Sequence, residues 1–223
     1  MRLVKTPAAP AESDQALVKA LPPLIRALAV KGILRRYRAK TTLIEEGDHG
    51  DTLFVVVSGL LRIYCSDARG HEITLALYGP GEYVGEMSLD GAPRTASVAT
   101  ETASLCATVS GQALRQHLAE NPAFALELIT RLIRRTRLAT ESARSMALLD
   151  AYGRLTRLFD GLAVTAADGA RRIEQKLTHL AISQRIGCSR ELVSRILKDL
   201  ETGGYISGKN HQYDLLRTFP SRW

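Results

Sequence analysis

The spacing of apolar residues between Asn121 and Asp150 predicts one long amphipathic helix. Asn121 can cap its first turn, and Pro122 suits the first helical position because its missing N–H donor costs nothing there. At 1.5 Å per residue the helix would span roughly 42 Å. We expect one apolar stripe to cover its own domain and the other to meet a second copy of the chain, with a buried helix of a single-chain bundle as the alternative. The two stripes are Ala125, Leu128, Leu132, Ala139, Met146 and Leu149 on one side, and Ile129, Ile133, Ala143 and Ala147 on the other.

A different pattern, short β-rich runs separated by glycines, fills the segment from Gly32 to Val109. Many short strands of this kind are typical of an antiparallel barrel or jelly roll. The competing interpretation is a cupin-like enzyme, which would need converging metal ligands where this segment offers only His49 and His71. The predicted strands are Gly32–Tyr37, Thr42–Glu45, Leu53–Ser58, Gly59–Ser66, Glu72–Tyr78 and Ser97–Val109, the last with a break near Glu101.

Short helices are predicted on both sides of the β-rich segment, over Leu21–Val30 and Gly111–Glu120. Residues 1–20 mix alanine, proline and scattered charge, which predicts a loose leader that becomes helical near Gln15. The N-terminus lacks the apolar core of a secretory signal, and no window approaches a membrane-spanning length of apolar residues. We therefore expect a cytoplasmic protein without a membrane partner.

The helical register breaks after Leu149, and Asp150 can cap a new helix over Ala151–Leu162. A turn at residues 167–169 and a strand over Arg171–Leu177 are predicted to follow. This break predicts a hinge between two domains, residues 1–150, which end in the long helix at about 121–150, and residues 151–223.

The second predicted domain contains two short helices joined by a tight turn. Thr178 can cap the first, which ends near Ile186, and Ser189 can cap the second, Arg190–Glu201, with Gly187 in the turn between them. This arrangement fits a helix-turn-helix motif. The strands Tyr205–Ser207 and Gln212–Leu216 can pair as a wing, and the aromatic tail 219–223 extends beyond it.

The second helix of this motif has distinct apolar and polar faces. Its apolar residues, Leu192, Val193, Ile196, Leu197 and Leu200, are predicted to face inward. Arginine can bridge two acceptors of guanine, and a carboxylate can accept from the cytosine amine. The opposite face therefore has the groups needed to read DNA bases, although an ordinary solvated face has the same composition; its residues are Arg190, Glu191, Ser194, Arg195 and Lys198.

The distribution of charge supports a polyanionic partner for the second domain. Residues 1–150 contain 18 Lys and Arg against 16 Asp and Glu, whereas residues 151–223 contain 12 against 7. A basic excess concentrated in a small domain favours DNA as the partner.

The cysteines and histidines favour neither a disulfide framework nor a metal site. Cys65, Cys106 and Cys188 are far apart and odd in number, and the five histidines show no metal-binding spacing. We expect reduced thiols and no metal. Cys188, in the predicted turn, is interpreted as a small packing residue rather than a redox group.

The segment Tyr83–Ala99 interrupts the strands with a glycine and a short helical turn, Glu86–Leu89. Backbone N–H groups at such a turn can stabilise an anion, and the guanidinium of Arg94 with the hydroxyl of Thr95 could hold a phosphate. Glu86 could then accept a sugar hydroxyl. The alternative is a simple ion pair between Glu86 and Arg94 under a surface loop.

Gly85-Glu86-Met87 followed by Arg94-Thr95-Ala96 resembles the phosphate-binding cassette of cyclic-nucleotide-binding domains. Together with the long helix and the string IGCSRELVSRILK, it is similar to the CRP/FNR family of transcription regulators over roughly residues 25–217. The resemblance implies an α+β fold with an N-terminal antiparallel jelly-roll barrel, a long dimerisation helix and a C-terminal winged helix-turn-helix. It implies a homodimeric DNA-binding regulator rather than an enzyme.

The resemblance also implies a cyclic-nucleotide effector. Gly85 and Glu86 would contact the ribose, Arg94 and Thr95 the cyclic phosphate, and Met87 and Ser88 complete the same site. Two adjacent hydroxyl residues of the long helix contact the adenine in cyclic-AMP-responsive members, and here Ala139 replaces the first while Thr140 keeps the second. Cyclic AMP is the first choice, with cyclic GMP or cyclic di-GMP as alternatives. A haem sensor also stays open, whereas an iron–sulfur sensor needs clustered cysteines.

For DNA, the resemblance implies base contacts by Arg190, Glu191 and Arg195, with Leu192 in place of a common threonine. Thr178, Ser189 and Lys198 are expected at phosphates, with Ser194 on the same face. The expected half-site resembles TGTGA. RNA polymerase is an implied partner, although the loop at residues 164–170, where relatives touch it, is shorter here. A barrel with a protein-interaction module in place of a DNA-binding domain is the alternative from another class.

Overall fold

The computed structural model describes residues 12–167 and 169–220, which fall into two compact units. The first unit comprises residues 12–65 and 74–134, and the second comprises residues 66–73 and the chain from residue 135 onward. The unit boundary falls inside the long helix α4 (Pro122–Leu148), so the two-domain division at residue 150 stays a prediction. None of the described helices is long and apolar enough to cross a membrane.

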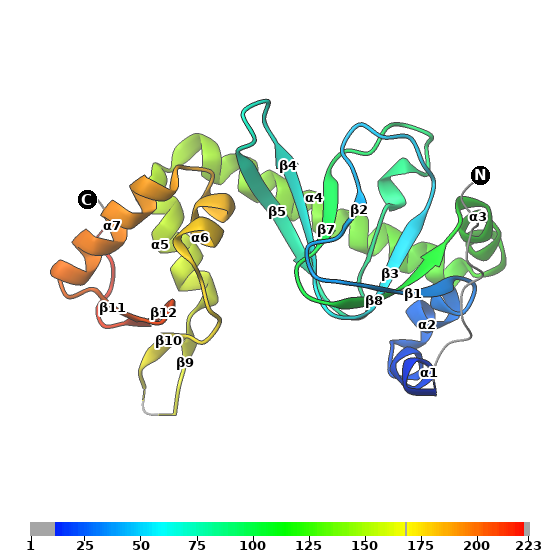
Figure 1. Ribbon diagram of the computed structural model, residues 1–223, viewed down its shortest axis with the longest axis horizontal. Helices are drawn as coiled ribbons and strands as arrows, with labels where there is room; N and C mark the ends of the chain where they lie inside the picture. The colour runs from blue at the N-terminus through cyan, green and yellow to red at the C-terminus, as the bar shows by residue number, and fades with distance from the viewer. Residues whose placement is uncertain (1–11, 168, 221–223) are drawn as a thin grey trace. The chain divides into compact units, whose positions relative to one another are not determined.

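Two four-stranded antiparallel sheets form the first unit, with strand orders β1-β8-β3-β6 and β2-β7-β4-β5 (Figure 1). The predicted jelly-roll fold class is therefore confirmed. The short β6 was not predicted, because two residues are too few to show a strand pattern. The strands are β1 (Ile33–Tyr37), β2 (Thr42–Ile44), β3 (Leu53–Ser58), β4 (Leu61–Ser66), β5 (Glu72–Tyr78), β6 (Tyr83–Val84), β7 (Ser97–Thr100) and β8 (Ser104–Val109).

Strand β3 is buried on both faces and joins two parts of the core. Val55 and Val57 belong to a cluster with helical residues, while Phe54 and Val56 belong to a cluster between the sheets. Successive strand residues point to opposite faces, so one apolar run can serve both clusters. The helices that cover this end of the sheets in Figure 1 are α1 (Glu12–Lys19), α2 (Pro23–Ala29) and α3 (Gly111–Glu120).

The predicted long helix is present as α4, which has 27 residues. Its first N–H bonds, from Phe124 and Ala125, go to the backbone carbonyl of Asn121. The Asn121 side chain, predicted to cap α4, instead donates to the His117 carbonyl at 3.1 Å and so closes α3. Helix α3 ends just before Asn121 and α4 begins just after it, and the side-chain amide nitrogen of Asn121 bonds α3.

The first apolar stripe packs on the core of its own unit, where Leu128 is buried and Leu132 is partly buried. On the other stripe, Ile129 is 52% exposed and Ile133 is 49% exposed. The two stripes of α4 therefore differ in burial within the first unit, as the sequence pattern predicts.

The second unit contains three helices beyond α4 and a four-stranded antiparallel sheet of order β11-β12-β10-β9. Its core joins Leu155, Ile182 and Leu200 of the helices to Ile173 and Tyr213 of the sheet. The elements are α5 (Ala151–Leu162), β9 (Val164–Thr165), β10 (Arg171–Ile173), α6 (His179–Ile186), α7 (Arg190–Thr202), β11 (Ile206–Lys209) and β12 (Gln212–Leu215).

The structure changes two details of the predicted second domain. Strand β10 ends at Ile173 rather than Leu177, and β9 pairs with it inside the segment predicted to be a loop. The wing turns at Asn210 and His211, which both adopt positive φ. Of the predicted aromatic tail, Phe219 has its ring centre 6.5 Å from the ring centre of Phe159. Residues 1–11 of the predicted leader, Asp168 of the predicted turn and residues 221–223 lie outside the described residues.

Candidate functional site

Strand β6 leads directly into the predicted phosphate cassette. Gly85 follows it with φ of 98°, and the 3₁₀ helix η1 (Glu86–Ser88) begins at the next residue. A Cβ on Gly85 would lie 2.5 Å from the Thr52 carbonyl oxygen and 2.9 Å from Arg94 Nη1. Only glycine allows both this backbone conformation and this close approach.

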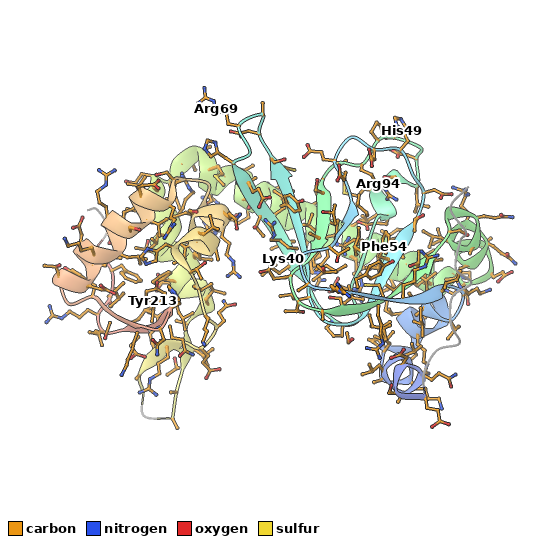
Figure 2. All side chains as sticks on the ribbon, viewed as in Figure 1. Lys40, His49, Phe54, Arg69, Arg94 and Tyr213 are labelled. Carbon is orange, nitrogen blue, oxygen red and sulfur yellow. The ribbon has the colours of Figure 1, made fainter. Side chains whose placement is uncertain are left out.

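Arg94 is buried, with 7% of its surface exposed, beside the loop that carries His49 (Figure 2). Its Nη1 donates to the Gly85 carbonyl at 2.9 Å, and its Nη2 donates to the Thr52 carbonyl at 2.8 Å. Its backbone N–H also donates to the Asp48 carbonyl at 2.8 Å. These bonds hold the guanidinium in one orientation next to Gly85.

Burial lowers the pKa of Arg94, while the nearby carboxylates of Asp51 and Glu86 raise it. Arginine is effectively always protonated in proteins, so the group remains a cation at neutral pH. A buried cation with a fixed fork of donors is well suited to hold a phosphate.

The structure brings the cassette residues together around Arg94. Glu86 and Ser88 are buried, whereas Met87 is exposed in the same turn. The Thr95 hydroxyl donates to the Met87 sulfur at 3.7 Å. Thr140 belongs to the second compact unit and donates to Thr136 on its own helix, so its role at the effector stays a prediction.

The helix-turn-helix of the second unit begins with two capped helices. The Thr178 hydroxyl accepts from Ala181 N at 3.1 Å, and the Ser189 hydroxyl accepts from Leu192 N at 3.2 Å. Gly187 has φ of 65° in the turn between α6 and α7. The predicted caps and turn are therefore confirmed.

Helix α7 buries its apolar face and exposes the predicted polar face. Val193, Ile196, Leu197 and Leu200 are buried, and Leu192 packs partly buried against the same core. Ser194 is half-buried, and its hydroxyl donates to the Arg190 carbonyl at 3.1 Å. The charged residues of the other face are all exposed: Arg190, Glu191, Arg195 and Lys198.

Two family models match this chain in the same two regions. The cyclic nucleotide-binding domain matches residues 34–121, and the Crp-like helix-turn-helix domain matches residues 153–218. A curated relative, the cAMP-activated global transcriptional regulator CRP of Salmonella typhimurium, is 34% identical over 78% of this chain and 85% of its own length. The chain belongs to the CRP/FNR family of transcription regulators.

Other relatives span similar lengths. The CRP-like cAMP-activated global transcriptional regulator of Mycobacterium tuberculosis is 33% identical over 74% of this chain and 75% of its own length. The structure of the c-di-GMP responsive global regulator CLP from Xanthomonas campestris is similar with a TM-score of 0.78 and 26% identity, over 87% of this chain and 99% of that one. These CRP/FNR relatives are regulators of transcription, not enzymes.

One part of this CRP/FNR member that the sequence patterns missed is a histidine contact at the start of α6. His179 Nδ1 lies 2.7 Å from the Ser194 hydroxyl, and its ring lies 6.3 Å from that of His211 in the wing. Burial lowers the pKa of His179, and the charges of His211 and Arg190 add to this effect. The two histidines are 32 positions apart in the sequence, so no local pattern joins them.

Cys188 packs partly buried against the core of the same unit, as predicted. Burial raises the pKa of its thiol, with Arg154 acting in the opposite direction. A raised pKa keeps the thiol protonated and therefore a weak nucleophile. Among the described residues, no group of three or more potential metal ligands lies together.

Proposed function

We propose that this CRP/FNR member is a homodimeric transcription regulator that binds an inverted-repeat operator in response to a cyclic nucleotide. The observation that carries the proposal is Arg94, a buried cation fixed beside the left-handed Gly85, in a chain that also has a winged helix-turn-helix. In this proposal Arg94 and Thr95 hold the cyclic phosphate. Glu86 accepts from the ribose, and Thr140 contacts the base.

The first choice of effector is cyclic AMP, because curated relatives at 32–35% identity carry the name cAMP-activated. Cyclic di-GMP is the alternative, because a structurally similar regulator is named as responsive to it. Cyclic GMP is a third candidate. Phosphate and sugar contacts are common to all three ligands, so discrimination falls to the base and to the Ala139-Thr140 pair.

The proposed dimer interface is the exposed apolar stripe of α4. Ile129 and Ile133 of this stripe are large, exposed and one helical turn apart, so a second copy of the helix could bury them. Two-fold symmetry then requires an inverted repeat with half-sites about 34 Å apart. A TGTGA-like half-site would be read by Arg190, Glu191 and Arg195.

The proposed mechanism is a population shift. A nucleotide held by Arg94 and by Thr140 favours one arrangement of α4 and of the hinge at residues 148–150, and with it one spacing of the two α7 helices. RNA polymerase is the proposed downstream partner of the complex.

Titration calorimetry with cyclic AMP, cyclic GMP and cyclic di-GMP tests the effector. We expect one of them to bind, and Arg94→Leu to abolish this binding while the circular dichroism spectrum stays unchanged. Arg69→Leu is the matched control, because Arg69 is exposed and outside the cassette. Unchanged nucleotide binding by folded Arg94→Leu protein would contradict the proposed site.

Fluorescence polarisation with a TGTGA inverted repeat tests the DNA function. We expect tight, salt-sensitive binding that strengthens with the effector. Equal affinity for a scrambled duplex of the same length would contradict sequence-specific recognition. Bound metal together with an absence of DNA affinity would favour the alternative of a barrel with an interaction module.

A further inference from the structure

Arg131 joins α4 to the turn that precedes the cassette. Its Nη1 donates to the Gly81 carbonyl at 2.9 Å and to Glu82 Oε2 at 2.8 Å. Its guanidinium carbon lies 5.1 Å from the centre of the Tyr83 ring, within the range of a cation–π contact. The Arg131 side chain is only 14% exposed. One side chain of α4 therefore holds three consecutive residues of the turn.

The orientation of this guanidinium is itself fixed. Arg131 Nε donates to Glu127 Oε1 at 2.6 Å, and Glu127 lies one turn earlier on α4. Charge-assisted hydrogen bonds of this kind are about twice as strong as neutral ones, and a planar fork that makes several has little freedom to rotate. Arg131 is thus a rigid connection rather than a mobile surface charge.

The turn that Arg131 holds continues directly into the effector site. Tyr83 begins β6, which pairs with β3 through Val55, and Gly85 and Glu86 follow one and two residues after β6. This segment is therefore fixed by β3 on one side and by α4 on the other. A displacement of the cassette would act on Arg131.

The exposed apolar stripe lies on the other side of the same helix. Ile129 and Ile133 are two residues before and after Arg131, and each residue turns an α-helix by about 100°. Both isoleucines therefore project roughly 160° from the direction of Arg131. At this level α4 has the cassette turn on one side and its proposed dimer stripe on the other.

We propose that Arg131 is a positioning residue that couples nucleotide binding in the cassette to the arrangement of α4. This inference rests on the proposed function, because it assigns a regulatory role at the proposed effector site. Arg131 holds the turn at residues 81–83 in the position that presents Gly85 and Glu86 to the nucleotide. The same contact transmits a shift of the cassette to the helix. Because coupling is reciprocal, packing a second copy on α4 changes nucleotide affinity by the same factor as nucleotide binding changes the affinity between the two copies.

The chain supplies a matched control for this role. Arg134 bonds the same carboxylate, with Nη2 at 2.9 Å from Glu82 Oε1, but its side chain is 59% exposed. An exposed pair of this kind contributes little, because solvent screens it and the side chain loses entropy. Arg131→Ala and Arg134→Ala therefore remove the same charge from the same helix. They differ in whether the cassette turn loses its anchor.

Hydrogen exchange of the unliganded protein tests the anchoring without any nucleotide. We expect Arg131→Ala to increase exchange of the amides at residues 83–88, and Arg134→Ala to leave them unchanged. Should Arg131→Ala fail to fold, Arg131→Met retains the aliphatic stem and tests the loss of the guanidinium contacts alone. Equal exchange in both single variants would overturn the anchoring role.

Titration calorimetry and sedimentation equilibrium then test the coupling. We expect Arg131→Ala to weaken nucleotide binding about ten-fold, because the cassette turn loses its anchor, and to abolish the nucleotide-induced change in the dimer dissociation constant. Arg131→Lys, which keeps the charge but not the fork, should restore part of both effects. Wild-type coupling in folded Arg131→Ala protein would overturn the proposal. Failure of the wild type to bind any of the three nucleotides would overturn the proposed effector instead, and the exchange comparison would still decide the role of Arg131.

Discussion

The cassette of the first unit and the recognition face of α7 in the second unit use arginine in opposite ways. Arg94 is buried and donates to two backbone carbonyls. Arg190, Arg195 and Lys198 are exposed, and within the described part of the chain none of them makes an ion pair. A small-molecule site can be pre-formed because the ligand has one shape, whereas a DNA face gains its partners only on binding.

This difference predicts how each region responds to substitution. The cassette depends on backbone conformation and close approach, so a single added carbon can disrupt it. The α7 face depends on separate side chains, so each substitution should remove one contact and leave the others intact. A substitution in the cassette should leave DNA affinity nearly unchanged when the nucleotide is saturating. A substitution on α7 should leave nucleotide affinity nearly unchanged.

Among the changes that test this comparison, the largest effect is expected from Gly85→Ala. The new Cβ would meet the Thr52 oxygen at 2.5 Å, and the residue would have to adopt a φ of 98°. Backbone strain of this kind costs roughly 1–3 kcal/mol, and the clash also displaces Arg94. We expect nucleotide affinity to fall about 100-fold, measured by calorimetry.

Gly91→Ala is the matched control for this prediction. Gly91 also has positive φ, at 84°, but no heavy atom lies within 4 Å of the position that a Cβ would occupy there. It therefore carries the conformational strain without the clash. An equal loss of nucleotide affinity in both variants would show that conformation alone, rather than close approach to Arg94, limits the cassette.

A smaller effect is expected from Arg195→Ala on α7. Loss of one base contact should weaken operator binding by about 1–3 kcal/mol and relax specificity at one position of the half-site. Lys198→Ala should instead weaken binding to all sequences and reduce the salt slope by about one unit. Polarisation assays over a salt series distinguish the two. Identical effects of both variants on operator and scrambled DNA would contradict the division of roles.

The smallest effect is expected from a change of pH, which should alter the stability of both units. The loss of stability at acidic pH should be larger in the first unit than in the second. Burial lowers the pKa of His117, which is 1% exposed, and Lys31 adds to the shift while Glu120 opposes it. Burial also lowers the pKa of the half-buried His179. A lowered pKa means that the unfolded chain binds the proton first, so stability is complete above the ordinary histidine pKa of about 6.5 and falls as pH drops below it.

Urea unfolding at about pH 7.5 and at about pH 5.5, monitored by hydrogen exchange, measures this effect in each unit. We expect a lower midpoint at the acidic pH. His117→Gln should remove much of the change in the first unit, whereas His49→Gln, at an exposed position, should not. A first unit that becomes more stable on acidification would contradict the sign of the prediction.

The sequence predicted most elements of the fold because their signals are local. The caps of α5, α6 and α7, at Asp150, Thr178 and Ser189, all form the predicted side-chain bonds. The apolar period of α7 likewise identified its buried face. The Asn121 cap was wrong because the end of α3 and the start of α4 share this residue, and a local pattern does not show which helix receives the side chain.

The residues of the candidate cassette were named from the sequence, but their arrangement in space was not predicted. Gly85, Glu86, Arg94 and Thr95 were named from their residue types and from the family resemblance. Thr52, whose carbonyl accepts from Arg94 across 42 positions, was not named. An acceptor on the backbone leaves no trace in residue type, so only the strand arrangement could identify it.

By itself, the sequence determined the helices, the apolar and polar faces of α7 and the family, because helical period, capping chemistry and motif spacing act over a few residues. The tertiary structure decided which distant groups meet. It places the Gly85 cassette against Arg94 and Thr52, and it anchors the preceding turn to Arg131 across 49 positions. Those contacts depend on strand register and on where α4 crosses the sheets, which the whole core sets together.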